Sequence, residues 1–500
     1  MSLNRVLHIF LIAYLACTAL THDFDDTIAV VGAGYSGLSA AFTLVKKGYT
    51  NVEIYESQGE VGGYVYSVDY NNVAHDLATY ALTPAYWKFQ EAMKSIGVGF
   101  CELDVAIVQT NSTPVSVPFE KWMAAYWAAK VPNPLNLVRK VSTQVSTYVE
   151  VWKKLFNMDF IDTSTKRTNR LFPLKTNDVD VLAQFSMPMK DFVALHKLDL
   201  LEPLFIQATD SQAYGPYDTT PALYYMVWFP PNLFNGEENT VPCGTYNSMQ
   251  SMAEHMAEWL KSKGVTFHMN TKVTKISRAT DGSSPSLLEE GVATPKLFDT
   301  IISTNKLPSA NRAEVVTPLL PKEREAADTY EELQMFSALL ETNRSDAIPT
   351  TGFLMVDADA IIAHDPNTGF WGCLNAERRG GYSDENAILS SDTVTRVSAI
   401  YYYTERANNE RIDFSLDEKI QQVKTNLATW DSATWTNLTS RTFGGYFQRW
   451  RTPDVMGQKP WNLADIQGEG DVYYVNSAAC GFESVGHVFD CADNLIKDFF

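Results

Sequence analysis

The sequence predicts an α/β protein in which a Rossmann-like nucleotide-binding domain is interleaved with a second, α+β domain. Three observations predict this class. An apolar strand at residues 28–31 runs into Gly-Ala-Gly-Tyr-Ser-Gly at residues 32–37. Segments rich in helix formers (119–155 and 179–205) and short strand-like runs (353–356, 370–374 and 397–403) lie outside this unit. The 500 residues, 45% hydrophobic, exceed what one core usually holds, so two associated domains are expected.

The first unit has the order that dinucleotide binding requires. After the buried strand, Gly32 allows a tight turn, Gly34 lets the backbone approach a pyrophosphate, and Gly37 allows close packing of helix on strand. The phosphates then lie at the N-terminus of the helix expected over residues 38–47, where free N–H groups and the helix dipole favour anions. A second strand, 52–55, ends in Glu56, whose carboxylate is expected to accept hydrogen bonds from ribose hydroxyls.

Gly62 and Gly63 follow Glu56 by a few residues, and a Gly-Gly pair at this position favours FAD over NAD because of the family that it resembles. Strand, glycine turn, acid and Gly-Gly pair together resemble the flavin-containing amine oxidoreductase superfamily, in which the Gly-Gly turn touches the pyrophosphate. The usual third residue of that turn is arginine, and Tyr64 replaces it here. The resemblance implies cofactor-binding roles for the residues of both turns: Gly32, Gly34, Tyr35, Ser36, Gly37, Glu56, Gly62, Gly63 and Tyr64.

Later segments extend the resemblance over most of the chain. Residues 264–277 resemble the family's strand pair beside the adenine, with Val273 at the contact position, and residues 298–304 resemble the strand that returns to the FAD domain. Residues 470–477 are similar to its last strand. Asn476-Ser477 stands where the family has Gly-Glu or Gly-Asp, so an amide or the Ser477 hydroxyl must serve the ribityl chain. In the helix expected over 483–495, N–H groups around Ser484 and Val485 would face the flavin pyrimidine ring.

The predicted domains follow from these segments. Residues 22–110, 241–305 and 455–500 form a discontinuous FAD-binding domain, and residues 111–240 and 306–454 form the substrate domain. The substrate site is expected between them. Residues 1–21 are interpreted as a secretory signal peptide, because a short apolar run follows Arg5 and precedes an acidic stretch; a mitochondrial presequence or a signal anchor is the alternative. The protein is therefore expected to be secreted or to reside in the lumen of the secretory pathway.

Composition limits the partners. A formal charge of −19 disfavours nucleic acid and anionic membrane surfaces, and no segment after the leader predicts a membrane span. No His, Cys, Asp or Glu cluster has metal-ligand spacing, so no metal is expected. Of the six cysteines, five follow the leader, and they predict buried thiols with at most one or two disulfides. The sequence does not specify an oligomeric state.

Because a flavin itself performs the redox step, the protein is expected to supply a substrate pocket and not a catalytic triad. Relatives place aromatic side chains over the flavin from C-terminal segments, so the resemblance favours Phe447 and Trp450 as its wall, with a core position as the alternative for each. His75 is either an acid-base group or a structural histidine, and His487 either supplies positive charge near the pyrimidine ring or faces solvent.

Two absences relative to the resembled family shape the functional hypotheses. Residues 333–342 lack the lysine that many relatives hold near flavin N5, and residues 440–470 lack the cysteine used for covalent attachment. Noncovalent FAD is therefore expected. The first hypothesis is hydride removal from a C–H of an apolar small molecule, leading to oxidation, desaturation or oxidative cyclisation; a resemblance to the fungal β-cyclopiazonate dehydrogenase-like flavoproteins implies secondary metabolism. The alternatives are an amine or polyamine oxidase, a redox-neutral isomerase of polyunsaturated fatty acids, and a flavin-binding protein without catalytic activity.

Overall fold

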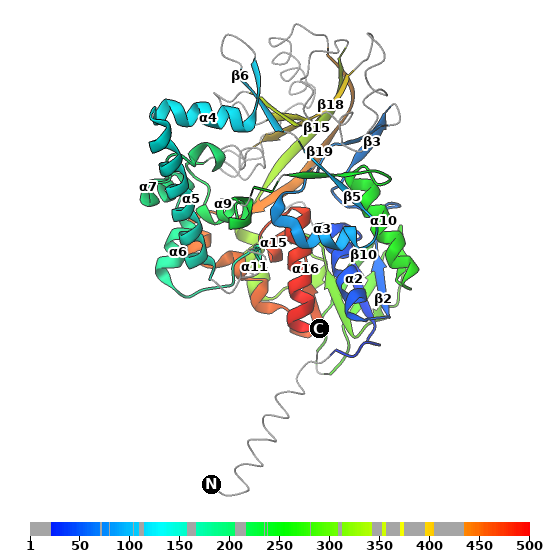
Figure 1. Cartoon of the computed structure of the whole chain (residues 1–500). Helices are drawn as coiled ribbons and strands as arrows, with labels where there is room; N and C mark the ends of the chain where they lie inside the picture. Colours follow the sequence, from blue (N-terminus) through cyan, green and yellow to red (C-terminus); the bar gives the residue numbers. More distant parts are fainter. Residues whose placement is uncertain are drawn as a thin grey trace, which may run out of the picture.

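The computed structural model describes residues 22–70, 73–79, 81–103, 105–109, 115–157, 167–205, 217–234, 236–237, 239–280, 282–308, 313–342, 353–356, 371–374, 396–404 and 435–500. The predicted signal peptide, residues 1–21, lies outside these ranges. The first described residue, His22, stacks on Phe500 with ring centroids 4.3 Å apart, so the two ends of the described chain lie together (Figure 1).

A five-stranded parallel sheet carries the predicted nucleotide-binding unit. Its order is β20-β13-β1-β2-β9. All four residues of β1 are buried, as expected for a parallel strand covered on both faces. Helix α16 lies beside α2 in Figure 1, and α10 also packs on α2. The strands are β1 (Ile28–Val31), β2 (Val52–Tyr55), β9 (Thr266–His268), β13 (Thr300–Ser303) and β20 (Val472–Tyr474); the helices are α2 (Tyr35–Lys47), α10 (Met249–Ser262) and α16 (Val485–Phe499).

A four-stranded sheet of order β12-β11-β10-β14 adjoins this layer. The expected strand pair of residues 264–277 is divided between the two sheets, because β9 pairs with β2 whereas β10 pairs with β11 and β14. The strands are β10 (Val273–Ser277), β11 (Ser286–Glu289), β12 (Lys296–Leu297) and β14 (Val316–Thr317), and α11 (Pro321–Thr329) follows them.

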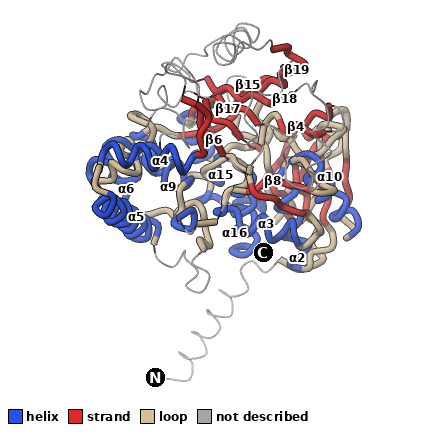
Figure 2. The backbone as a smooth tube through the Cα atoms, turned by 45° about the horizontal axis from the view of Figure 1, so that its top comes forward, coloured by secondary structure: helices blue, strands red, loops and turns tan. Residues whose placement is uncertain are grey.

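The second large sheet has seven strands in the order β19-β15-β18-β17-β16-β6-β7. Pairing is antiparallel except between β16 and β6. The three predicted strands correspond to β16, β17 and β18. Figure 2 shows this sheet apart from the helices of the nucleotide-binding layer. The strands are β6 (Val105–Gln109), β7 (Val115–Pro118), β15 (Glu331–Thr342), β16 (Phe353–Val356), β17 (Trp371–Leu374), β18 (Arg396–Thr404) and β19 (Trp435–Arg449).

Two predicted domain boundaries need correction. Strand β6 was predicted to lie in the FAD-binding segment 22–110, but it pairs with β16 and β7 in the second sheet. Strand β14 was predicted to lie in the substrate segment 306–454, but it pairs with β10. Both strands are short, and hydrogen bonding to strands remote in sequence, which local pattern does not encode, decides their sheet.

A helical layer fills the region predicted to be helical. Tyr148 Oη donates to the carbonyl of Phe229 at 2.8 Å, and Trp152 Nε1 donates to that of Met226 at 2.8 Å, so two buried aromatic residues of α5 fasten it to the α9 segment. In Figure 1 these helices gather on one side of the molecule. They are α4 (Phe119–Lys130), α5 (Pro134–Phe156), α6 (Val179–Ser186), α7 (Met189–His196) and α9 (Ala222–Trp228).

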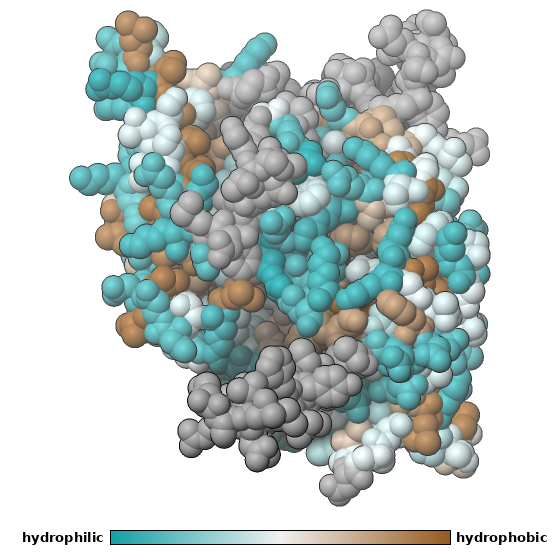
Figure 3. All heavy atoms as spheres, turned by 60° about the horizontal axis from the view of Figure 1, so that its bottom comes forward, coloured by the Kyte–Doolittle hydropathy of each residue, from teal (hydrophilic) through white to brown (hydrophobic). Residues whose placement is uncertain are grey.

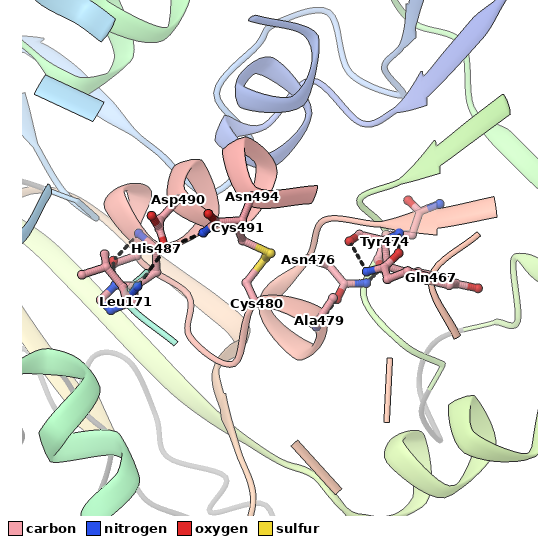
Figure 4. The surroundings of a disulfide bond; sticks show 12 residues. Leu171, Gln467, Tyr474, Asn476, Ala479, Cys480, His487, Asp490, Cys491 and Asn494 are labelled. Atoms are coloured by element: carbon pink, nitrogen blue, oxygen red, sulfur yellow. Dashed lines mark hydrogen bonds between the residues drawn. A yellow bond between two sulfur atoms is a disulfide. The ribbon is translucent and has the colours of Figure 1, made fainter. Parts of the chain in front are cut away.

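Short elements connect the layers. Ribbon β5–β8 carries a disulfide between Cys101 and Cys243, and a second disulfide joins Cys480 to Cys491 (Figure 4). The described cysteines thus include two disulfides, the upper bound of the prediction. The remaining elements are β3 (Ser67–Tyr70), β4 (Val73–Asp76), β5 (Gly99–Glu102), β8 (Thr240–Cys243), α3 (Trp87–Lys94), α14 (Thr452–Met456), α15 (Ser477–Cys480), and 3₁₀ turns at Pro84–Tyr86, Pro231–Phe234, Lys459–Trp461, Ala464–Ile466 and Glu469–Asp471.

The molecular surface is largely hydrophilic on the face that Figure 3 shows. On the face in Figure 3, hydrophilic side chains cover most of the coloured surface, and apolar ones occur in small groups. None of the helices within the described ranges is both long and apolar enough to span a bilayer.

Candidate dinucleotide and active site

The glycine turn after β1 has an accessible, uncapped helix N-terminus. Gly34 is the N-cap of α2 and supplies no side-chain cap, and the first turn of α2 contains no acidic residue. Gly32, Gly34 and Ser36 are partly exposed, whereas Tyr35 and Gly37 are buried. Because the first N–H groups of a helix lack intrahelical partners, this turn suits a phosphate.

The Gly-Gly turn packs directly against the first turn. Gly62 donates its N–H to the carbonyl of Ala33 at 2.9 Å. A Cβ added at Gly63 would lie 2.9 Å from the Cα of Gly34, so position 63 requires glycine for the backbones to approach, whereas a Cβ at Gly34 would lie 3.5 Å from the Cα of Gly63. A Cβ at Gly37 would meet the carbonyl oxygen of Gly32, which is the close helix-to-strand contact that the motif predicts. The two turns form one backbone cradle, and they fit a dinucleotide.

Glu56 lies at the end of β2 and is 8% exposed. One carboxylate oxygen accepts the N–H of Ala33 at 2.8 Å, and the other accepts the N–H of Gln58 at 2.8 Å. The carboxylate therefore braces the glycine turn, and its remaining lone pairs are suited to accept ribose hydroxyls.

The other predicted cofactor residues take distinct positions. Tyr35 directs its hydroxyl to the carbonyl of Met249 at 2.7 Å, so only its backbone remains for a phosphate. Val273 begins β10 and is buried. The side chain of Asn476 caps α15 and donates to the carbonyl of Asn305 at 2.7 Å, which leaves the hydroxyl of buried Ser477 as the candidate for the ribityl chain.

The N-terminus of α16 is capped by Ser484, whose hydroxyl oxygen accepts the N–H of His487 at 3.3 Å. Val485 is the first residue of the helix and is buried. Both alternatives for His487 were wrong: its side chain is buried, and burial lowers its pKa to about 3, so it is neutral. The structure brings this helix end to the same edge of the sheet as the glycine cradle, because β20 and β1 run parallel.

Of the three pocket candidates, the structure describes the side chains of Trp450 and His75, and both are buried. Trp450 is 1% exposed within the main hydrophobic cluster, and its backbone N–H donates to the hydroxyl of Tyr224 at 2.6 Å, which favours the core alternative. Phe447 belongs to β19, and its side chain lies outside the described part of the structure. His75 is buried on β4. Its neighbour Asp76 accepts the N–H of Met249 at 3.1 Å, which ties this hairpin to α10.

Sequence reasoning missed a row of rings and cations that connects the cradle to the second sheet. The ammonium of Lys306 lies 4.1 Å from the ring centroid of Tyr64, which lies 6.5 Å from that of Phe443. The guanidinium of Arg441 lies 5.2 Å from the Phe443 ring and 4.3 Å from the ring of Tyr66. Tyr64 is 38% exposed, so the row is accessible from solvent.

A cavity of about 260 Å³ lies elsewhere, beside the disulfide of Figure 4. Its lining includes Phe172, Lys175, Trp461, Cys480 and Asn494, and none of its residues belongs to the glycine cradle. The lining also includes His487 and Ala479, so the cavity lies against the helices α15 and α16 and away from the glycine turns.

The backbone cradle of the two glycine turns, the Glu56 carboxylate and the N-termini of α2 and α16 together define the class of protein. It is a dinucleotide-binding oxidoreductase of the two-domain flavoprotein class. Residues 35–339 match the family model described as flavin containing amine oxidoreductase, and the chain belongs to this family. It is accordingly an FAD-dependent oxidoreductase, with the noncovalent FAD that is typical of the family.

Known relatives are similar to this chain to different extents. A segment of 71 residues is 38% identical to protoporphyrinogen oxidase 2 of Arabidopsis thaliana, and it spans 14% of each chain. The solved structure of a CLA-producing fatty acid isomerase from P. acnes has a TM-score of 0.70 at 18% identity, covering 96% of this chain and all of that one. Wild-type putrescine oxidase bound to putrescine has a TM-score of 0.63 at 14% identity, with 95% and 98% covered. At these identities the structural likeness shows the fold.

Proposed function

We propose that the enzyme removes a hydride from a C–H of an apolar small molecule that carries no positive charge. The bound flavin supplies the acceptor for the hydride. The protein supplies the cradle that orients the cofactor and the aromatic surface that receives the substrate. Removal of this hydride would lead to oxidation, desaturation or oxidative cyclisation of the substrate in secondary metabolism.

The charge at the junction of the cradle and the second sheet carries this proposal. Lys306 pairs with Glu483 at 2.9 Å, and His487 is neutral. Glu483 is thus paired with Lys306, Glu332 is a second carboxylate near this lysine, and the guanidinium of Arg441 is a second cation. A protonated amine or polyamine bound against the Tyr66 and Phe443 rings would meet repulsion from the Arg441 guanidinium, since like charges in a partly desolvated site raise the free energy of binding. The amine oxidase alternative is disfavoured for that reason.

The second candidate is a redox-neutral isomerase of polyunsaturated fatty acids. Arg441 and Phe443, two residues apart on β19, place a cation beside an aromatic ring, as a carboxylate on an apolar chain would require. The similarity to the fatty acid isomerase over nearly the whole chain is compatible with this candidate.

We propose further that the protein is secreted or lumenal. The disulfides Cys101–Cys243 and Cys480–Cys491 support an oxidising compartment.

Anaerobic mixing tests the function. The purified enzyme is mixed separately with putrescine, linoleate and an apolar host-metabolite fraction while flavin absorbance is recorded. Lasting bleaching by an uncharged apolar component supports the dehydrogenase proposal, and linoleate converted without net bleaching would support the isomerase instead. Bleaching by putrescine would refute both.

A further inference from the structure

Lys306 is a buried lysine at the junction of the two large sheets. It follows β13 by three residues, and its side chain is 11% exposed. Thr304, just before it, donates its hydroxyl to the carbonyl of Val31 at 2.6 Å, which fixes this segment against the strand that leads into Gly32. Lysine is almost never buried unless its charge is compensated, so this position calls for an explanation.

Three separate segments hold the ammonium. Glu483, just before α16, pairs with Nζ at 2.9 Å, and the Tyr64 ring lies under Nζ at 4.1 Å to its centroid. The carbonyl of Gly445 on β19 accepts a hydrogen bond from the same nitrogen. Lys306 therefore joins the Gly-Gly turn, the start of α16 and the second sheet.

The ammonium remains charged in this environment. Burial lowers the pKa of Lys306 more than any single neighbour raises it, but Glu483, Tyr64 and Glu332 together raise the pKa above the ordinary lysine value. The N-termini of α2 and α16, with their partial positive charges, lie at the same edge of the parallel sheet. A group bound there lies in a field that favours negative charge.

We infer that Lys306 tunes the bound FAD: held by Glu483 and Tyr64, its ammonium stabilises the negative charge that the flavin gains on reduction. Hydride transfer moves two electrons and one proton from the substrate C–H to FAD, which becomes an anion, while the substrate releases one further proton to solvent. This role rests on FAD as cofactor and not on which substrate is oxidised. Lys306 also supplies a fixed cation in a chain whose residues 333–342 contain no lysine.

The test measures the two-electron reduction potential of bound FAD against a reference dye, with no substrate present. Lys306→Met should weaken binding of reduced FAD about tenfold relative to oxidised FAD, which lowers the potential by about 30 mV. Glu483→Gln should raise the potential, because it removes the charge that offsets Lys306. Lys306→Arg keeps the cation, so its reduction potential should stay near that of the wild type.

A matched control separates this role from a structural one. Lys88 is a buried lysine, 13% exposed, that pairs with Asp490 of α16 at 2.6 Å, away from the cradle. Lys88→Met should leave the potential unchanged. General damage to the fold would shift the reduction potentials of Lys306→Met and Glu483→Gln in the same direction, and that result would overturn the inference. A wild-type potential in both variants would overturn it as well. Wild-type protein without FAD would instead contradict the cofactor assignment.

Discussion

Acidification from pH 7 to pH 5 should destabilise this protein through His487. Its Nε2–H donates to the carbonyl of Val227 at 3.4 Å, and its Nδ1 accepts the hydroxyl of Ser484 at 2.6 Å. The ring lies 4.3 Å from that of Phe482 and 5.4 Å from that of Tyr86, measured between centroids. Both polar atoms of the ring are used by the neutral form, and apolar rings surround it.

The sign and size of the effect follow from the two pKa values. Burial lowers the pKa of His487 from 6.5 to about 3 in the folded state. Between these values the unfolded chain binds a proton that the folded chain does not, so stability falls as pH decreases from about 6.5 towards 3. At pH 5 the loss relative to pH 7 is about 2 kcal/mol from this group alone.

Urea unfolding at the two pH values measures this loss. His487→Gln removes the titrating group and should lose about 2 kcal/mol less than the wild type between pH 7 and pH 5. The comparison cancels the contribution of carboxylates, which both proteins share. Equal losses in the two proteins would refute the assignment of a buried neutral histidine.

Three further predictions concern the cofactor, the pocket and processing. Gly34→Val should abolish FAD binding, since its side chain would occupy the pyrophosphate site; full flavin content in the purified variant would show that the cradle is misplaced. If Trp450 is a core residue, Trp450→Ala should cost about 3 to 5 kcal/mol of stability and lower the flavin content as well. If Phe447 lines the flavin, Phe447→Ala should keep the flavin content and the melting temperature but lose turnover. Measuring flavin content, melting temperature and turnover on both variants decides the role of each residue. N-terminal sequencing of protein from its native host should find a mature chain starting between Thr18 and Asp25, and an intact Met1 would contradict secretory processing.

Local motifs predicted the cradle well because its function depends on backbone. Gly37 and Gly63 are recognisable from sequence, since a missing side chain allows α2 to pack against the Gly32 carbonyl and the two turns to meet. Glu56 follows from its place at the end of β2 in the same way. These positions could be predicted without knowing which distant segments surround them.

Side chains whose role depends on distant partners were not predictable. Lys306 has no local signal except a charge shortly after a buried strand, and its partners Tyr64 and Glu483 are remote in sequence. His487 was expected to be charged or exposed, because its sequence position does not reveal the rings of Tyr86 and Phe482 around it. Tertiary packing decided both cases.

The ribbon of β5 and β8 has a consequence for how the helical layer is attached to the rest of the chain. The chain leaves through Cys101 and returns through Cys243, which the disulfide binds together 142 residues apart in sequence. The segment between them includes β6, β7 and the helices α4 to α9, and its two ends keep a fixed spacing because the disulfide joins them. A protease cut within that segment would also leave both fragments covalently joined. Exchange of substrate-recognition segments at this ribbon would have to preserve the contacts that the intervening residues make with the cofactor domain, such as the hydrogen bond from the N–H of Leu171 to Asp490 of α16 at 2.8 Å.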